Sequence, residues 1–182
     1  MNLKPYPKYK KTDIEWIDEI PECWKQFRVK DVTLKITSGV TPKGGSEVYL
    51  TEGITFLRSQ NVYDYGLEIE NVKYIDNKTH RLMRNSRVLS GNILINITGA
   101  SIGRTCLLPD RFEGNINQHI ACLKLTNSTY KLYISIFLKS HFVKSFININ
   151  QLGASKEAFN LSQIASIPIL FPPLKTQQKI AT

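Results

Sequence analysis

Short apolar runs separated by polar clusters fill the middle of the chain, from residue 54 to residue 125. In the segment 92–98 isoleucines occupy alternate positions, with Leu94 and Asn96 on the opposite face, which predicts a half-buried strand. Similar runs predict further strands over 54–57, 72–75, 105–108 and 120–125. We therefore expect a twisted, largely antiparallel sheet in this region.

After residue 129 the apolar spacing lengthens. Apolar side chains recur every four positions, at Ile134, Leu138, Phe142 and Phe146. This spacing is typical of an amphipathic helix with one face on a core, and Ser128 or Thr129 is suited to cap its N-terminus. We expect one helix over this stretch.

The N-terminal part of the chain is less regular. The first 23 residues mix three prolines with four lysines, which predicts an extended lead-in anchored by Trp16 and Trp24. An i, i+3, i+7 apolar spacing over 29–36 predicts a short amphipathic helix that ends near Gly39.

The C-terminal segment, from residue 162, carries three local signals. It predicts a turn over 162–164, a strand over 167–171, and a helix from Thr176 after two prolines. With 182 residues and 42% hydrophobic content, the chain can bury one core. We expect one α/β (α+β) domain over residues 1–171, with the lead-in at 1–23, followed by a separate helical segment at 172–182.

The charge balance narrows the choice of partner. Lys and Arg outnumber Asp and Glu by 24 to 15, a net charge of +9, which favours a polyanion such as nucleic acid. Charge alone is equally compatible with a solvated basic surface. Three widely spaced cysteines and no signal-like start predict a reduced, cytoplasmic chain, with Cys106 and Cys122 in the core. No apolar run is long enough to span a bilayer, so we expect no membrane partner.

One stretch invites a catalytic interpretation. Residues 99–103, Gly-Ala-Ser-Ile-Gly, fit the G-x-S-x-G pattern that holds a nucleophilic serine between a strand and a helix. Here an apolar run follows Ser101 where the helix should begin. Asp110 with His119 or His141 would give the required order, but little chain remains to support them. We therefore interpret Ser101 as a loop residue.

Other catalytic signatures are missing from the sequence. It has no H-E-x-x-H motif, no metal-spaced cysteine set and no phosphate-binding G-x-x-x-x-G-K-[ST] loop. The F-P-P-L at 171–174 lacks the Asn and the aromatic residue that an amino-methyltransferase loop uses. We expect no catalytic residue, no metal and no enzyme activity. Two alternatives stay open: a fragment of a DNA-modifying methyltransferase or nuclease, and a protein-interaction module without DNA binding.

Polar loops at the ends of the predicted elements are the best candidates for a binding site. Arginine pairs well with guanine edges and Asn or Gln with adenine edges, whereas glycine-rich amides with Ser, Thr and Lys suit phosphate. Taken alone, each loop favours an ordinary turn over a base-reading segment. The candidate DNA-binding residues are Thr41, Lys43, Arg58, Ser59, Gln60, Asn61, Ser101, Arg104, Asn117, Gln118, His119, Ser155, Lys156 and Asn160.

Five segments together resemble a known family. In order they are PKYKKTDIEWIDEIPECWKQFRVKDV, SGVTP, ILINITGASIGRTCLL, NINQHIA and GASKEAFNLSQIASIPILFPPLKTQQKIA. Their order and content resemble a target recognition domain from the specificity subunit of type I restriction-modification enzymes. The resemblance spans essentially the whole chain and is most specific at its two ends.

The resemblance implies a fold and a role. It implies an α/β globule whose twisted sheet docks on the major groove of double-stranded DNA and reads one half of a bipartite target. It also implies a non-catalytic chain whose partners are the methylation and restriction subunits and a second recognition domain, with S-adenosylmethionine and ATP on those partner subunits. Residues 172–182 would open a long spacer helix. Because the sequence stops there, we expect a piece of such a subunit or a shortened one, with half-site reading as its function.

Overall fold

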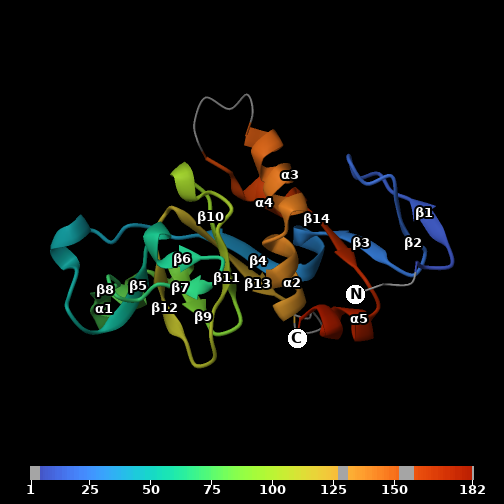
Figure 1. Cartoon of the computed structure of the whole chain (residues 1–182). Coiled ribbons are helices and arrows are strands. Elements are labelled where there is room, and N and C mark those ends of the chain that lie inside the picture. The colour runs from blue at the N-terminus through green and yellow to red at the C-terminus, as the bar shows by residue number, and fades with distance from the viewer. Residues whose placement is uncertain (1–4, 127–130, 152–157, 182) are drawn as a thin grey trace.

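The protein is described by a computed structural model that covers residues 5–126, 131–151 and 158–181. Two four-stranded sheets form its centre (Figure 1). Their strands are β4 (Thr33–Ser38), β5 (Ile54–Leu57), β8 (Lys73–Ile75), β9 (Arg87–Leu89), β10 (Ile93–Asn96), β11 (Thr105–Leu107), β12 (Glu113–Ile116) and β13 (Ile120–Leu125). The first sheet has the order β11-β10-β13-β4 and is antiparallel throughout. The second has the order β8-β5-β12-β9 and contains one parallel pair, β5 with β12.

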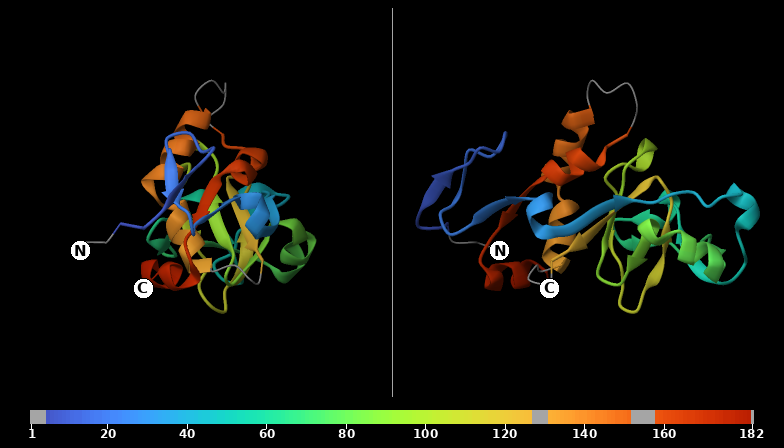
Figure 2. Two further views of the ribbon diagram at one scale, coloured as in Figure 1. Left: turned by 90° about the vertical axis from the view of Figure 1, so that its right-hand side faces the viewer. Right: turned by 180° about the vertical axis from the view of Figure 1, so that it is seen from behind.

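The described residues also form five α-helices and three strand pairs. The helices are α1 (Asn77–Leu82), α2 (Lys131–Leu138), α3 (His141–Gln151), α4 (Leu161–Ser166) and α5 (Leu174–Ile180). The strand pairs are β1 (Tyr9–Lys11) with β2 (Glu19–Pro21), β3 (Lys25–Arg28) with β14 (Pro168–Phe171), and β6 (Val62–Tyr63) with β7 (Gly66–Leu67). Short 3-10 turns are η1 (Val29–Val32), η2 (Gly45–Val48), η3 (Ser59–Asn61), η4 (Arg84–Ser86) and η5 (Gly99–Ser101). Figures 1 and 2 show the β1–β2 hairpin at one end of an elongated molecule and α1 towards the other.

The mixed α/β class, with mainly antiparallel sheets, agrees with the sequence prediction. The predicted strands 54–57 and 120–125 coincide with β5 and β13, and the other predicted strands are found within two residues of their expected ends. Strands β4, β9 and β12 were not predicted. They are set by pairing with distant strands, and that pairing leaves no local period in the sequence.

Strand β10 lies between two apolar layers. Ile93 and Ile95 pack among the residues of α2, α3 and α4, whereas Leu94 packs with Cys122 and Ile116 between the two sheets. The predicted strand is confirmed, but all four residues of β10 are buried, so the expectation that it is half-buried is wrong. The second sheet covers the face of β10 that carries Leu94. Each such aliphatic side chain contributes about 1.5–3 kcal/mol by leaving water.

The helix predicted over 29–36 is wrong beyond its first turn. Only η1 is helical, and β4 follows it and pairs with β13 in a register that places Ile36 opposite Leu123. Thr33 and Thr37 are β-branched, which favours the strand, and tertiary pairing overrides the helical spacing.

The single helix expected after residue 129 is two helices, α2 and α3. The Ser140 hydroxyl accepts a hydrogen bond from the Val143 amide (3.4 Å) and caps the start of α3. In α3 the buried positions are Val143 and Ile147, while Phe142 and Phe146 are only partly buried against the core. The four-residue spacing therefore identified the helical region but not its break.

Two smaller expectations also change. The turn expected over 162–164 is the helix α4, because Asn160 Oδ1 accepts from the Gln163 amide (2.9 Å) and caps it. The helix expected from Thr176 begins two residues earlier, at Leu174. The proposed N-caps Ser128 and Thr129 lie outside the described residues.

The lead-in holds the short β1–β2 hairpin and only one of its two expected anchors. Trp24 packs against a small cluster that contains Ile14, Ile20 and Leu170. Trp16 is 48% exposed. The expectation is therefore confirmed for Trp24 and wrong for Trp16.

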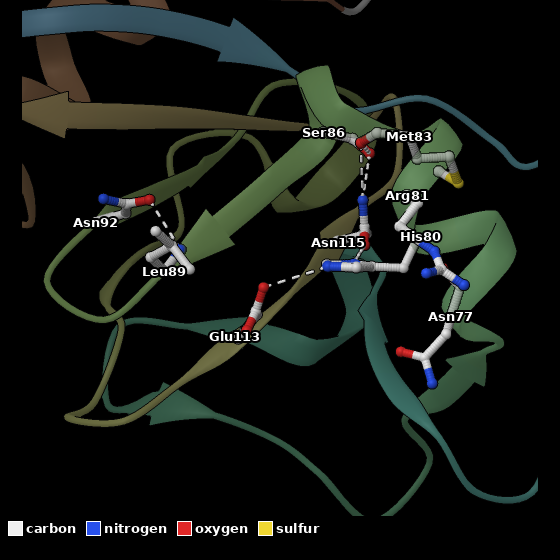
Figure 3. A network of polar contacts seen from close by, with 9 residues as sticks. All are labelled: Asn77, His80, Arg81, Met83, Ser86, Leu89, Asn92, Glu113 and Asn115. Carbon is white, nitrogen blue, oxygen red and sulfur yellow. Dashed lines mark hydrogen bonds and ion pairs between the residues drawn. The ribbon is translucent and has the colours of Figure 1, made fainter.

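A buried polar network ties α1 to the second sheet (Figure 3). His80 is 4% exposed, and its Nδ1 contacts Asn115 Oδ1 (2.5 Å). The Asn115 amide group donates to Ser86 Oγ (2.8 Å) and to the Met83 carbonyl (3.0 Å). The other ring nitrogen of His80 contacts the Glu113 carboxylate at 3.2 Å. Every polar end of the Asn115 side chain is therefore paired inside the protein.

The cysteines agree with the predicted core. Cys106 and Cys122 lie between the sheets, and burial raises the pKa of each thiol to about 12. Cys23 is an exposed free thiol. In the part of the chain that the structure describes, no helix has the length and apolarity needed to cross a membrane.

Candidate nucleic-acid interface

Three segments that are far apart in the sequence meet around a surface hollow of about 420 Å³. They are η3 with the following Tyr63, the loop that contains η5, and the turn between β12 and β13. Its lining residues are Ser59, Gln60, Tyr63, Thr98, Gly99, Ala100, Ser101, Arg104 and His119. We call it the Arg104 hollow. It brings together five predicted site residues, namely Ser59, Gln60, Ser101, Arg104 and His119.

The η5 loop owes its shape to two glycines. Gly99 and Gly103 have φ of 66° and 80°, a region that side chains with a Cβ rarely adopt. The Gly103 amide donates to the Asn96 carbonyl (2.9 Å), and the Asn96 amide donates to the Arg104 carbonyl (2.9 Å). A Cβ at Gly99 would meet no described atom within 4 Å, so this side of the loop is open to an approaching ligand.

A lysine from α3 fixes the loop to its neighbours. Lys144 Nζ lies 3.1 Å from an Asp64 carboxylate oxygen and also donates to the Gly103 carbonyl. Asp64, in the β6–β7 turn, accepts a hydrogen bond from the Thr105 amide (2.8 Å). The β6–β7 hairpin, the η5 loop and α3 are thereby held together at one edge of the Arg104 hollow.

Arg104 lies against an aromatic pair on the β6–β7 hairpin. Its guanidinium carbon is 4.5 Å from the ring centroid of Tyr63. The Tyr63 ring is stacked on that of Tyr65, with centroids 5.0 Å apart and an interplanar angle of 16°. Tyr63 thus contacts both Arg104 and Tyr65, and we call these three side chains the Arg104–Tyr63–Tyr65 stack; Tyr65 is 74% exposed.

A chain of hydrogen bonds borders the opposite edge. Thr41 Oγ1 donates to Gln118 Oε1, and Gln118 Nε2 contacts His119 Nε2 at 3.2 Å. The Gln118 amide nitrogen can only donate, so this contact assigns an acceptor role to His119 Nε2. His119 Nδ1 then donates to Thr98 Oγ1 (2.6 Å), which leaves the Thr98 hydroxyl proton for another partner.

Other predicted residues lie elsewhere or make internal contacts. Lys43 lines a neighbouring hollow of about 740 Å³, together with Thr41 and Arg84. The Arg58 guanidinium donates to the Asn71 carbonyl (2.9 Å). The Asn61 side chain is buried, accepts from the Arg58 amide and donates to the Glu68 carbonyl (2.9 Å).

The remaining candidates are placed as follows. Asn117 is 8% exposed, and its Oδ1 accepts from the His119 amide (3.2 Å). Asn160 is the N-cap of α4. Ser155 and Lys156 lie outside the described residues. The structure thus gathers part of the candidate set in one hollow and gives Arg58, Asn61, Asn117 and Asn160 internal roles.

Sequence reasoning missed several residues of this site. Tyr63 and Tyr65 carry a signal that could have been used, since two tyrosines flank the turn of a Tyr-Asp-Tyr-Gly hairpin. Thr98, Asp64 and Lys144 have no local sequence signal that could have identified them. Their contacts connect positions up to 80 residues apart.

The geometry gives Ser101 no catalytic relay. Its hydroxyl lies 3.5 Å from the Thr98 carbonyl, whereas His119 bonds to Thr98 Oγ1 and Asp110 accepts from the Ser90 hydroxyl at 3.4 Å. Within residues 5–126, 131–151 and 158–181 there is no group of three or more His, Cys, Asp or Glu suited to a metal ion.

The fold and the hollow define a class of protein: a small α/β domain whose polar loops converge on an exposed surface. Residues 21–182 match the family described as "Type I restriction modification DNA specificity domain". The match covers most of the chain, and the chain belongs to this family.

Individual relatives agree with this assignment. The chain is 24% identical over 178 residues to a protein of Methanocaldococcus jannaschii named as the specificity subunit of type I restriction enzyme MjaX, covering 95% of this chain and 40% of that protein. It is 21% identical over 168 residues to the type I restriction enzyme EcoBI specificity subunit of Escherichia coli, covering 88% and 34%.

Solved structures share the fold. The HsdS subunit from Thermoanaerobacter tengcongensis superimposes with a TM-score of 0.63 at 18% identity, over 95% of this chain and 38% of that one. The S subunit of a type I restriction-modification system from M. genitalium gives 0.62 at 17% identity, over 88% and 37%. The chain spans about two fifths of the length of these relatives.

Proposed function

We propose that this chain is a non-catalytic recognition domain that binds double-stranded DNA and reads one half of a bipartite target. The observation that supports the proposal is the Arg104 hollow, where side chains from three distant segments converge at the ends of buried strands. Family membership supports the same role, since the family is named for DNA specificity.

The hollow offers the chemistry that base reading needs. The side chains of Ser59, Gln60 and Arg104 make no hydrogen bond to other described residues, so their donors and acceptors are available to a ligand. Gln60 suits the adenine edge and Arg104 the guanine edge, because each can form two parallel hydrogen bonds there. Lys43 and Arg84, in the adjoining hollow, are placed to contact phosphates beside the reading site.

We also propose that this chain works as part of a complex with other subunits. By family analogy, the methylation and restriction subunits and a second recognition domain would be the protein partners, and S-adenosylmethionine and ATP would bind to the partner subunits. Helix α5, after the two prolines, would then be the start of the spacer helix that joins two recognition domains.

Duplex binding over a salt series provides the first test. The net charge of +9 should give weak binding to random duplex DNA at low salt, falling steeply as salt rises. We expect a slope that corresponds to ~3 to 6 neutralised phosphates. Absence of binding at low salt, or binding that is insensitive to salt, would contradict the proposal and favour a protein-interaction module.

Selection from a library of random duplexes provides the second test. A recognition domain should enrich one short sequence, whereas a merely basic surface should enrich none. Cleavage and methyl-transfer assays with the chain alone should both be negative. Turnover in either assay would favour the enzyme-fragment alternative.

A further inference from the structure

We propose that the Arg104–Tyr63–Tyr65 stack positions the Arg104 guanidinium to read a single guanine, with Tyr63 as the positioning residue. This inference rests on the proposed function, because it assigns one base of the target to one side chain. It also adds the β6–β7 hairpin, which holds none of the residues predicted for the site, to the reading surface.

The backbone under Arg104 is fixed at both ends. Its amide donates to the Ser101 carbonyl (3.0 Å), and its carbonyl accepts from Asn96 in the buried strand β10. The side chain then crosses the face of Tyr63 at 4.5 Å, where a planar guanidinium is attracted by the ring. A long and flexible side chain thus has its direction restricted before any ligand arrives, which lowers the entropy lost on binding.

Tyr63 is itself supported from behind. Tyr65 stacks on the Tyr63 ring, and Asp64 between them is held by the Thr105 amide and by Lys144. The hairpin and the η5 loop therefore share one set of contacts. This arrangement keeps the ring in place on a hairpin whose two strands are only two residues each.

The surroundings favour a base edge over a phosphate as the partner of Arg104. Among the described lining residues of the hollow, Arg104 is the only Lys or Arg. The others include Ser59, Gln60 and Ser101, neutral side chains whose hydrogen bonds are directional. A phosphate site commonly gathers several cations or a row of amides, whereas a lone guanidinium beside amide and hydroxyl groups fits a guanine O6/N7 edge.

The test compares three variants by selection from random duplexes and by binding to the selected duplex and its single-base variants. Arg104→Ala should reduce the preference for guanine at one position by about 5- to 100-fold. Tyr63→Leu keeps an apolar side chain of similar bulk but removes the ring face, and should reduce the same preference about 2- to 5-fold. Tyr63→Phe keeps the ring and should restore the wild-type preference to within about 2-fold.

Each outcome bears on the proposal separately. A uniform loss of affinity on all duplexes for Arg104→Ala would assign Arg104 to a phosphate and overturn the inference. Equal base preference in Tyr63→Leu and wild type would overturn the positioning role of Tyr63. Urea unfolding of all three variants shows whether the fold is retained. Failure of the wild type to select any sequence would instead contradict the proposed function itself.

Discussion

Two polar clusters in this protein have similar residue types and opposite surroundings. The His80–Asn115 network is buried, and the side chain of Asn115 is hydrogen-bonded at both its oxygen and its nitrogen. In the Arg104 hollow, the side chains of Gln60 and Arg104 reach solvent with no hydrogen-bond partner among the described residues. The first cluster uses its donors and acceptors within the fold, whereas those of Gln60 and Arg104 in the second are not used by the described residues.

The difference shows why a polar side chain cannot be assigned a role from its type alone. A buried amide that loses its partners costs the folded state dearly, so Asn115 is required for stability. An exposed amide such as Gln60 contributes little to the stability of the fold, because water can replace its hydrogen-bond partners. Substitutions in the two clusters should therefore separate stability from DNA affinity.

The largest effect is expected for Asn115→Leu. This change leaves the His80 ring, the Ser86 hydroxyl and the Met83 carbonyl without their buried partner, and we expect a loss of about 3 kcal/mol in the free energy of unfolding. Urea unfolding gives the value. Thiol labelling near pH 8 is an independent readout, because Cys106 and Cys122 should react only after unfolding, whereas Cys23 reacts in the folded protein.

Gln60→Ala is the matched control for this comparison. It removes an exposed amide from the hollow and should change the unfolding free energy by less than about 0.5 kcal/mol. A loss of stability as large as that of Asn115→Leu would show that the two clusters do not differ as described.

Arg104→Ala should show the reverse behaviour. We expect DNA binding to weaken by about 1–3 kcal/mol on the selected duplex, with a free energy of unfolding within about 1 kcal/mol of wild type, since only the half-buried contact with Tyr63 is lost. Fluorescence anisotropy with a labelled duplex measures the binding. Unchanged affinity on both selected and random duplexes would remove Arg104 from the reading surface.

Lys144→Met should have a smaller effect, both on the stability of the fold and on the η5 loop beside the hollow. It removes the ion pair with Asp64 and the bond to the Gly103 carbonyl while keeping much of the side-chain volume. Because the pair is partly exposed, we expect a loss of about 0.5–1 kcal/mol in stability. Amide exchange in the η5 loop should become faster. An unchanged exchange rate would show that Lys144 does not hold this loop.

Ser101→Ala should have the smallest effect. Its hydroxyl makes one long contact, 3.5 Å, with the Thr98 carbonyl, and at most one hydrogen bond to DNA would be lost. We expect DNA affinity to fall by no more than about 1 kcal/mol. A loss of several kcal/mol would show that Ser101 has a role that a loop hydroxyl does not explain.

The sequence was most informative where a signal is local. The β-strand period located β5, β10 and β13, and the apolar spacing located the helical region that holds α2 and α3. The break between those helices depends on one capping serine, Ser140, which the spacing does not reveal. The strand β4 was mistaken for a helix because its conformation is set by pairing with β13.

The candidate site was also predictable only in part from the sequence. Ser59, Gln60, Ser101, Arg104 and His119 could be singled out because each follows or precedes an apolar run, and the structure brings them together. Arg58 and Asn61 lie in the same short segment as Ser59 and Gln60, yet they bond to the carbonyls of Asn71 and Glu68, which follow the β6–β7 hairpin. Only the folded structure distinguishes a side chain that faces solvent from one that hydrogen-bonds to a backbone carbonyl.

A titration of the ¹⁵N-labelled chain with the selected duplex shows directly whether DNA binds at the Arg104 hollow. If it does, the largest changes in amide chemical shift should fall on Ser59, Gln60, Ser101, Arg104 and His119, with the β1–β2 hairpin and α5 nearly unchanged. Largest changes on that hairpin or on α5, with the hollow unaffected, would contradict binding at the hollow.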